Sequence, residues 1–138
     1  MSAEMSFTAE QREELLRCPY EEVPVLAAQY HAAGNSWDVL GYFKKLWAEI
    51  PGFVNNDSGL HRVVCVDWNA CTKIDSAGNI AAGLEAVIGP VVAKWAKRLT
   101  FFGARLIPVQ TVIFFVALYI TQLGIRSYCG CREGAATP

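Results

Sequence analysis

A run of twenty residues without a charge, from Leu106 to Ile125, constrains this chain more than any other feature of its sequence. An α-helix rises about 1.5 Å per residue, so this run would measure roughly 30 Å, the thickness of the hydrocarbon core of a bilayer. A segment this long and this apolar is more often a membrane span than a buried helix. The sequence therefore predicts one C-terminal transmembrane helix, within residues 99–126.

Polar and cationic side chains around the run predict how it is held. Amide and hydroxyl groups can bond across helices in lipid, so contacts with neighbouring helices are expected from Pro108, Gln110, Thr111, Thr121 and Gln122. Cationic and aromatic residues on both flanks are expected at the membrane–water interfaces: Lys94, Trp95, Lys97, Arg98, Arg105, Arg126 and Tyr128. More cations precede the run than follow it, which predicts the N-terminal part on the cytosolic or matrix side.

The rest of the chain is predicted to be mainly α-helical, with residues 1–98 forming a small extramembrane part. Thr8 and Gln11 have the spacing of a capping box, which predicts a short helix to about Arg17. A second helix is expected to follow, to about residue 31. The apolar residues from Trp37 to Ile50 recur at helical spacing, and Pro51 is expected to end that helix. Residues 51–74 are predicted to form a loop and an extended strap, and residues 127–138 a short polar tail.

Residues 77–98 can be interpreted in two ways. The segment is small and apolar, which favours a helix at the membrane interface or packed against protein. The alternative is a second membrane-embedded helix, with the basic residues 94–105 as the turn of a hairpin. Glu85 favours the first interpretation, because a lone carboxylate at mid-bilayer depth costs a few kcal/mol unless it is paired.

The five cysteines are an odd number, so at least one of them has no partner within the chain. A disulfide framework is not expected, and plain thiols are predicted. Cys129 and Cys131, separated by one glycine, are the one candidate redox pair. No metal site is predicted, because the second half of a four-ligand set is missing.

Composition and motifs argue against several classes of function. The net charge of −1 is unsuited to binding nucleic acid, which needs a basic face. His61, Cys65 and Asp67 would share one face of an extended segment, but residues along one strand rarely reach catalytic geometry. The sequence thus predicts a protein that is not an enzyme and has no cofactor, metal or small-molecule substrate.

The layout of a compact helical part, one span and a short tail is similar to that of small accessory subunits of mitochondrial membrane complexes, such as those of respiratory enzymes or the ATP synthase. This resemblance implies a non-catalytic structural subunit, single-pass in the mitochondrial inner membrane, with its N-terminal part in the matrix. Its expected partners are other membrane subunits and the lipid bilayer. The acidic N-terminus lacks the pattern of a secretory or transit peptide, so targeting by the membrane segment itself is expected.

Two other functions remain open. One is a tail-anchored adaptor or receptor of the outer mitochondrial membrane or the endoplasmic reticulum. The other is a small membrane enzyme or carrier built on the hairpin, with Glu85 as its functional group.

Overall fold

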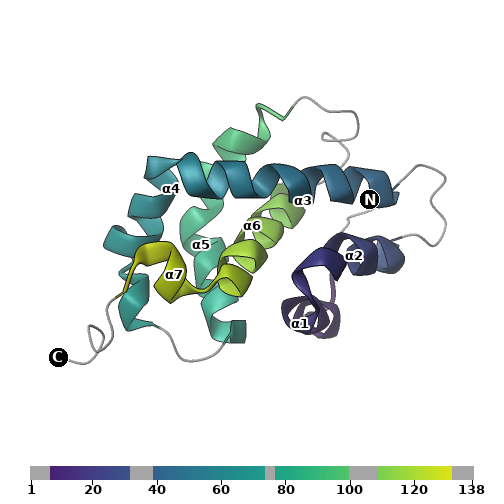
Figure 1. Cartoon of the computed structure of the whole chain (residues 1–138), viewed down its shortest axis with the longest axis horizontal. Helices are drawn as coiled ribbons and strands as arrows, with labels where there is room; N and C mark the ends of the chain where they lie inside the picture. The colour runs from purple at the N-terminus through teal and green to yellow at the C-terminus, as the bar shows by residue number, and fades with distance from the viewer. Residues whose placement is uncertain (1–6, 32–38, 74–76, 100–108, 132–138) are drawn as a thin grey trace.

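The computed structural model describes residues 7–31, 39–73, 77–99 and 109–131. These residues are mostly helical and contain no strand, which confirms the mainly α class. In chain order the elements are α1 (Ala9–Arg17), η1 (Tyr20–Glu22), α2 (Val23–His31), α3 (Val39–Asn56), α4 (Ser58–Arg62), η2 (Val63–Asp67), η3 (Ala70–Thr72), α5 (Ala77–Ala96), α6 (Val109–Leu123) and α7 (Ile125–Cys129). Figure 1 shows α6 in the middle of the bundle, with α3 crossing it and α1 and α2 beside it.

The predicted capping box begins α1. The Gln11 amide N–H donates to the Thr8 hydroxyl at 3.1 Å, and the Thr8 amide N–H donates to the Gln11 side-chain oxygen at 2.9 Å. Two N–H groups that a helix start leaves unpaired are thereby satisfied. The helix ends at Arg17, just before Cys18 and Pro19, as the sequence predicted.

Helix α3 does not stop at Pro51, and this corrects the prediction for residues 51–74. It continues through Pro51 to Asn56. A proline inside a helix removes one hydrogen bond, but Phe53 and Val54 continue the buried face of α3 beyond it. Phe53 stacks on Trp95 of α5, with ring centroids 4.3 Å apart. Burial of this face therefore outweighs the lost bond, and the helix persists.

The rest of the expected strap is helical as well. Asp57 caps α4 by accepting the Leu60 N–H at 2.9 Å, and α4 runs directly into the π-helical turn η2. The Trp68 ring that follows lies against Gly83 of α5, where an added Cβ would be 2.5 Å from the ring carbon Cζ2. A glycine at position 83 is what allows this close approach.

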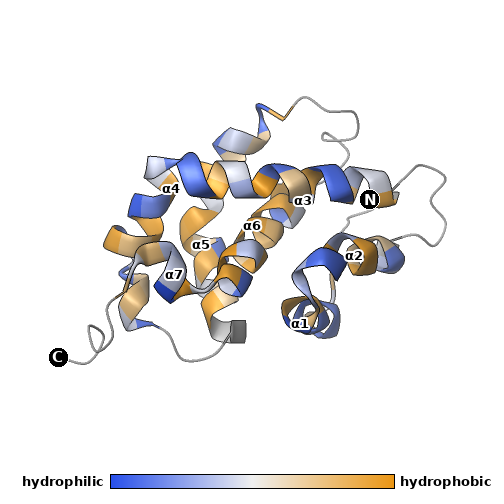
Figure 2. Ribbon diagram, viewed as in Figure 1, coloured by the Kyte–Doolittle hydropathy of each residue, from blue (hydrophilic) through white to orange (hydrophobic). Residues whose placement is uncertain are grey.

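The core lies between α5 and α6, which share the most extensive helix–helix contact of the described residues. Side chains from Thr111 to Leu118 of α6 are all buried, and so is Ile120. From α5, Leu84, Ile88 and Val92 are fully buried. Figure 2 shows apolar colouring along α6, while blue, hydrophilic residues lie on α1 and α3. The run without charges is therefore the central helix of the bundle.

The predicted transmembrane helix is not found in this structure. In the part of the chain that is described, no helix is both long enough and apolar enough to cross a membrane. Helix α6 has 15 residues and a length of about 22 Å, less than the roughly 30 Å that a crossing needs. Its apolar side chains pack against α1, α3 and α5. Residues 106–108 of the predicted span lie outside the described residues.

Gly124 separates α6 from α7. Its φ of +101° lies in a region that side chains strongly disfavour, and the chain turns there. Helix α7 ends at Cys129 and is followed by Gly130, which has a φ of +69°. These two glycines direct Cys129 and Cys131 back toward η2 and η3, where their sulfur partners lie.

Candidate functional site: the α5–α6 pair and its attachments

Two disulfides join the segment before α5 to the segment after α6. Cys65 of η2 is bonded to Cys129, with 5.4 Å between the Cα atoms, and Cys71 of η3 is bonded to Cys131, with 5.8 Å. Cys18 remains free. The expectation of five thiols is therefore wrong, and Cys129 and Cys131 are not paired with each other. The sequence could not supply this pairing, because any of the five cysteines could be the free one and the remaining four allow three connectivities.

The disulfides enclose α5 and α6 within one covalent ring. Cys71 precedes α5 by six residues, and Cys131 lies just beyond α7. Both ends of the apolar pair are thus held at one edge of the bundle. The sulfur of Cys65 is bonded to Cys129, so Cys65 has no thiol that could act as the nucleophile beside His61 and Asp67.

Helix α1 is attached to the middle of the α5–α6 pair. The Arg12 guanidinium forms an ion pair with the Glu85 carboxylate of α5 and lies 4.3 Å from the centre of the Phe114 ring of α6. The two charged side chains keep 33% and 18% of their exposed surface, so water screens the pair only partly. The sequence shows Glu85 as a lone charge, because its partner Arg12 lies 73 positions away.

Gln122 provides a second attachment between α1 and α6. Its side-chain N–H group donates to the carbonyl oxygens of Leu15 and Cys18, at 3.3 and 3.0 Å. Its Oε1 atom is buried and accepts no hydrogen bond from the described residues. The sequence predicted Gln122 as a helix-contact residue, and here it bonds to the backbone at the end of α1. A buried acceptor without a donor makes this attachment weaker than a fully paired one.

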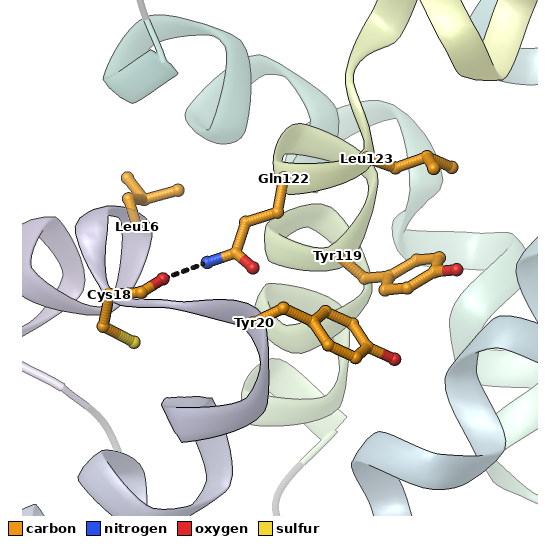
Figure 3. A pocket seen from close by; sticks show the side chains of 6 residues that line it. All are labelled: Leu16, Cys18, Tyr20, Tyr119, Gln122 and Leu123. Atoms are coloured by element: carbon orange, nitrogen blue, oxygen red, sulfur yellow. Dashed lines mark hydrogen bonds between the residues drawn. The ribbon is translucent and has the colours of Figure 1, made fainter.

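A cleft of about 600 Å³ opens beside Gln122, between the end of α1 and the end of α6. Figure 3 shows Gln122 between Cys18 and the rings of Tyr20 and Tyr119. Tyr20 packs against Trp47 at 5.1 Å and against Tyr119 at 5.8 Å between ring centroids. The cleft therefore combines aromatic walls with the polar side chain of Gln122.

Cys18 and Tyr128 are among the groups whose pKa values are raised. Burial, followed by the charge of Glu22, raises the pKa of the Cys18 thiol above its ordinary value of 9.0. Burial, followed by the charge of Asp57, raises the pKa of Tyr128 to about 12. The Tyr128 hydroxyl is buried without a hydrogen-bond partner among the described residues, which fits the dominance of burial.

The other predicted contact residues have separate positions. Thr121 donates its hydroxyl to the Ala117 carbonyl of its own helix at 2.8 Å, Thr111 is buried, and Gln110 is exposed. Gln122 is a predicted contact residue that bonds to another segment of the bundle, at the end of α1. Pro108 lies outside the described residues.

The residues predicted at the two membrane interfaces occupy several places in the bundle. Lys94 is exposed in the last turn of α5, Lys97 and Arg98 are exposed just beyond that helix, and Arg126 is exposed on α7. The aromatic members pack within the protein: Trp95 stacks on Phe53, and Tyr128 lies 5.1 Å from the His61 ring. Arg105 falls outside the described residues.

A second cleft, of about 430 Å³, lies between the end of α3, α4 and α7. Asn55, Asp57, His61 and Ser127 are among the residues that line it. No group of three or more histidine, cysteine or acidic side chains that could hold a metal ion occurs in the described ranges.

Comparison with known proteins adds no relative. No protein-family model matches the chain, and no curated protein or solved structure matches it.

Proposed function

We propose that this protein is a non-catalytic structural component of a membrane-associated assembly, and that the α5–α6 pair is the element that contacts the membrane or its resident subunits. The observation that carries this proposal is the pair itself. A helix whose side chains are almost all apolar packs along a second helix with one acidic and one basic residue, and both are held as a unit by disulfides.

The disulfides favour the two-helix alternative over a single span. One crossing at 106–125 would leave Cys65 and Cys71 on one side of the membrane and Cys129 and Cys131 on the other. Sulfur atoms separated by roughly 30 Å of hydrocarbon cannot bond to each other. The same reasoning weighs against the tail-anchored adaptor, which also needs one crossing between those cysteines.

The disulfides also bear on location. Such bonds persist in oxidising compartments and are rare where thiols are kept reduced. We therefore place the disulfide-bonded part of the protein in an oxidising compartment, in preference to the matrix side expected from the resemblance to mitochondrial subunits. The inner membrane remains compatible with the proposal if that part faces away from the matrix.

The test is co-migration in a native gel. Membranes from cells that make the protein are solubilised in a mild detergent, and the chain is followed by antibody. We expect it in the membrane fraction and in a complex well above its own 15.2 kDa. Recovery as a free chain in the aqueous fraction would overturn the proposal.

A photo-crosslinking amino acid identifies the contacting surface. Val109, the first residue of α6, keeps 40% of its surface exposed at the end of the pair. We expect the probe at position 109 to capture lipid or a membrane subunit. The matched control is the same probe at Glu49, an exposed residue of α3, where capture should be much weaker. Equal capture from both positions would contradict the assignment to α5–α6.

A further inference from the structure

Two clefts meet at the C-terminal end of α6, where Leu123 is a wall of both. The first is the cleft of about 600 Å³ beside Gln122, and the second is the cleft of about 430 Å³ beside Asp57. Leu123 lines both clefts and keeps 39% of its surface exposed. Figure 3 shows the Leu123 side chain pointing away from Gln122. Because the clefts share this wall, one ligand can occupy them together.

Each cleft is lined by a residue whose buried polar atom has no hydrogen-bond partner among the described residues. These atoms are Oε1 of Gln122 in the first cleft and the hydroxyl of Tyr128 in the second. A buried polar group without a partner costs free energy, and a ligand that supplies the partner recovers it. The amide oxygen needs a donor, because it can only accept, whereas a tyrosine hydroxyl can donate or accept. A ligand reaches either atom after a covering side chain rotates, since both are buried in the free chain.

The charges that act on the two clefts are acidic. Burial raises the pKa of the Cys18 thiol in the first cleft, and the charge of Glu22 raises it further. Burial and then the charge of Asp57 raise the pKa of Tyr128 in the second. No lysine or arginine is among the described residues that line either cleft. A cation is therefore the charge that this surface attracts.

The aromatic walls of the first cleft suit arginine in particular. The rings of Tyr20 and Tyr119 have centroids 5.8 Å apart, and Tyr20 keeps 41% of its surface exposed. A guanidinium group can lie over a tyrosine ring and still use its five N–H donors, whereas the ammonium of lysine is a compact and more strongly hydrated charge. Arg12 of this chain already combines such contacts, because its guanidinium lies over the Phe114 ring and pairs with Glu85.

Two recesses on either side of one apolar side chain fit an extended peptide. In an extended chain alternate side chains point to the same face, so residues i and i+2 can enter neighbouring recesses. The backbone between them offers N–H donors and carbonyl acceptors to polar groups of the second cleft, such as Asn55 and Ser127.

We infer that the surface formed by these two clefts, with Leu123 between them, binds an extended, arginine-containing segment of a partner protein. This inference rests on the proposed function in an assembly, and it names the kind of partner that the C-terminal end of α6 contacts.

A selection from random peptides tests the chemistry of the partner. The full chain, with its disulfides formed, is immobilised, and short random peptides displayed on phage are selected on it. We expect the selected peptides to be enriched in arginine, more than in lysine, and depleted of aspartate and glutamate. A selection that yields no binding peptide, or one that yields acidic or uncharged peptides, would overturn the inference.

Substitutions then test whether the selected peptide occupies the clefts, with binding measured by fluorescence anisotropy and folding checked by circular dichroism. Leu123→Lys places a cation between the clefts and should weaken binding at least about tenfold. Glu22→Gln combined with Asp57→Asn should weaken binding and reduce its dependence on salt, and asparagine at position 57 keeps a capping oxygen for α4. The matched control is Glu10→Gln combined with Glu49→Gln, two exposed residues that line neither cleft, which should change affinity by less than about twofold. Equal weakening by the two double variants would refute the assignment to the clefts.

The inference and the proposed function fail in different experiments. Recovery of the chain as a free protein in the native gel overturns the proposed function, and peptide binding can still be measured on the purified chain. A complex that is intact in the native gel, together with a selection that yields no arginine-containing peptide, overturns the inference alone.

Discussion

Removing one disulfide should cost far less than removing both, because the two bonds close nearly the same loop. Either bond alone connects residues 60 to 64 positions apart. In the loop-entropy relation, such a ring stabilises the folded state by about 4.3 kcal/mol at 25 °C. Once one bond is present, however, the other closes only the short ring formed by the six residues from Cys65 to Cys71 and the two from Cys129 to Cys131. A ring of about eight residues contributes about 2.5 kcal/mol.

The expected losses are therefore more than additive. Replacing Cys71 and Cys131 by alanine should lower the free energy of unfolding by about 2.5 kcal/mol, and replacing Cys65 and Cys129 should do the same. Replacing all four should lower it by about 7 kcal/mol, a large part of the 5–15 kcal/mol typical of a folded domain. The fourfold variant is thus expected to be partly or wholly unfolded at 37 °C.

Guanidinium chloride titrations followed by circular dichroism, without reductant, measure these differences. Cys18→Ala is the matched control, since this cysteine is free, and it should leave the midpoint nearly unchanged. A loss of about 4 kcal/mol from each single removal, adding to the loss from both, would refute the shared-loop reasoning. No loss from any removal would show that the bonds do not constrain the chain.

Three further predictions concern individual side chains. Arg12→Ala leaves the mostly buried Glu85 carboxylate without its partner and should lower the free energy of unfolding, measured by urea titration, by about 1–2 kcal/mol. Arg17→Ala breaks an exposed pair and should change the same free energy by less than about 0.5 kcal/mol. Equal effects of the two substitutions would contradict this account. Gly83→Ala adds a methyl group 2.5 Å from an indole carbon of Trp68 and should lower the free energy of unfolding by about 1–3 kcal/mol. Gly52→Ala meets open space and should raise the same free energy by up to about 1 kcal/mol. A Gly83 variant as stable as the original chain would show that the indole moves aside. The raised pKa of Cys18 leaves less thiolate at a given pH. Iodoacetamide should therefore alkylate Cys18 more slowly in the folded than in the unfolded protein at pH 8, and the alkylation rate of the folded protein should still rise above pH 9. A rate that levels off near pH 9 would contradict burial of the thiol.

Features that depend on neighbouring residues were predictable from the sequence. The capping box at Thr8 and Gln11 defines α1 by itself, and both of its bonds are present. The expected beginning of a helix at Ala77 agrees with α5. In each case the signal lies within one turn or one periodic segment, where the local backbone decides the outcome.

Features that depend on distant contacts were not predictable. Pro51 normally ends a helix, but stacking of Phe53 on Trp95 of a later helix keeps α3 intact. The disulfide partners are 60 and 64 positions apart, and nothing in the spacing of five cysteines selects this pairing over the others. The Arg12–Glu85 pair was missed for the same reason.

The run from Leu106 to Ile125 shows why hydropathy alone leaves the question of topology open. Its lack of charge makes it compatible with lipid, but α6 is equally well satisfied by the apolar faces of α1, α3 and α5 in the bundle. Hydropathy measures only how readily a segment leaves water. It does not say whether lipid or other helices of the protein then cover that segment. The disulfides add a constraint of another kind, because a covalent bond across the ends of α5 and α6 forbids an odd number of crossings. A single span and this pairing of cysteines exclude each other, so establishing either one by experiment decides the other.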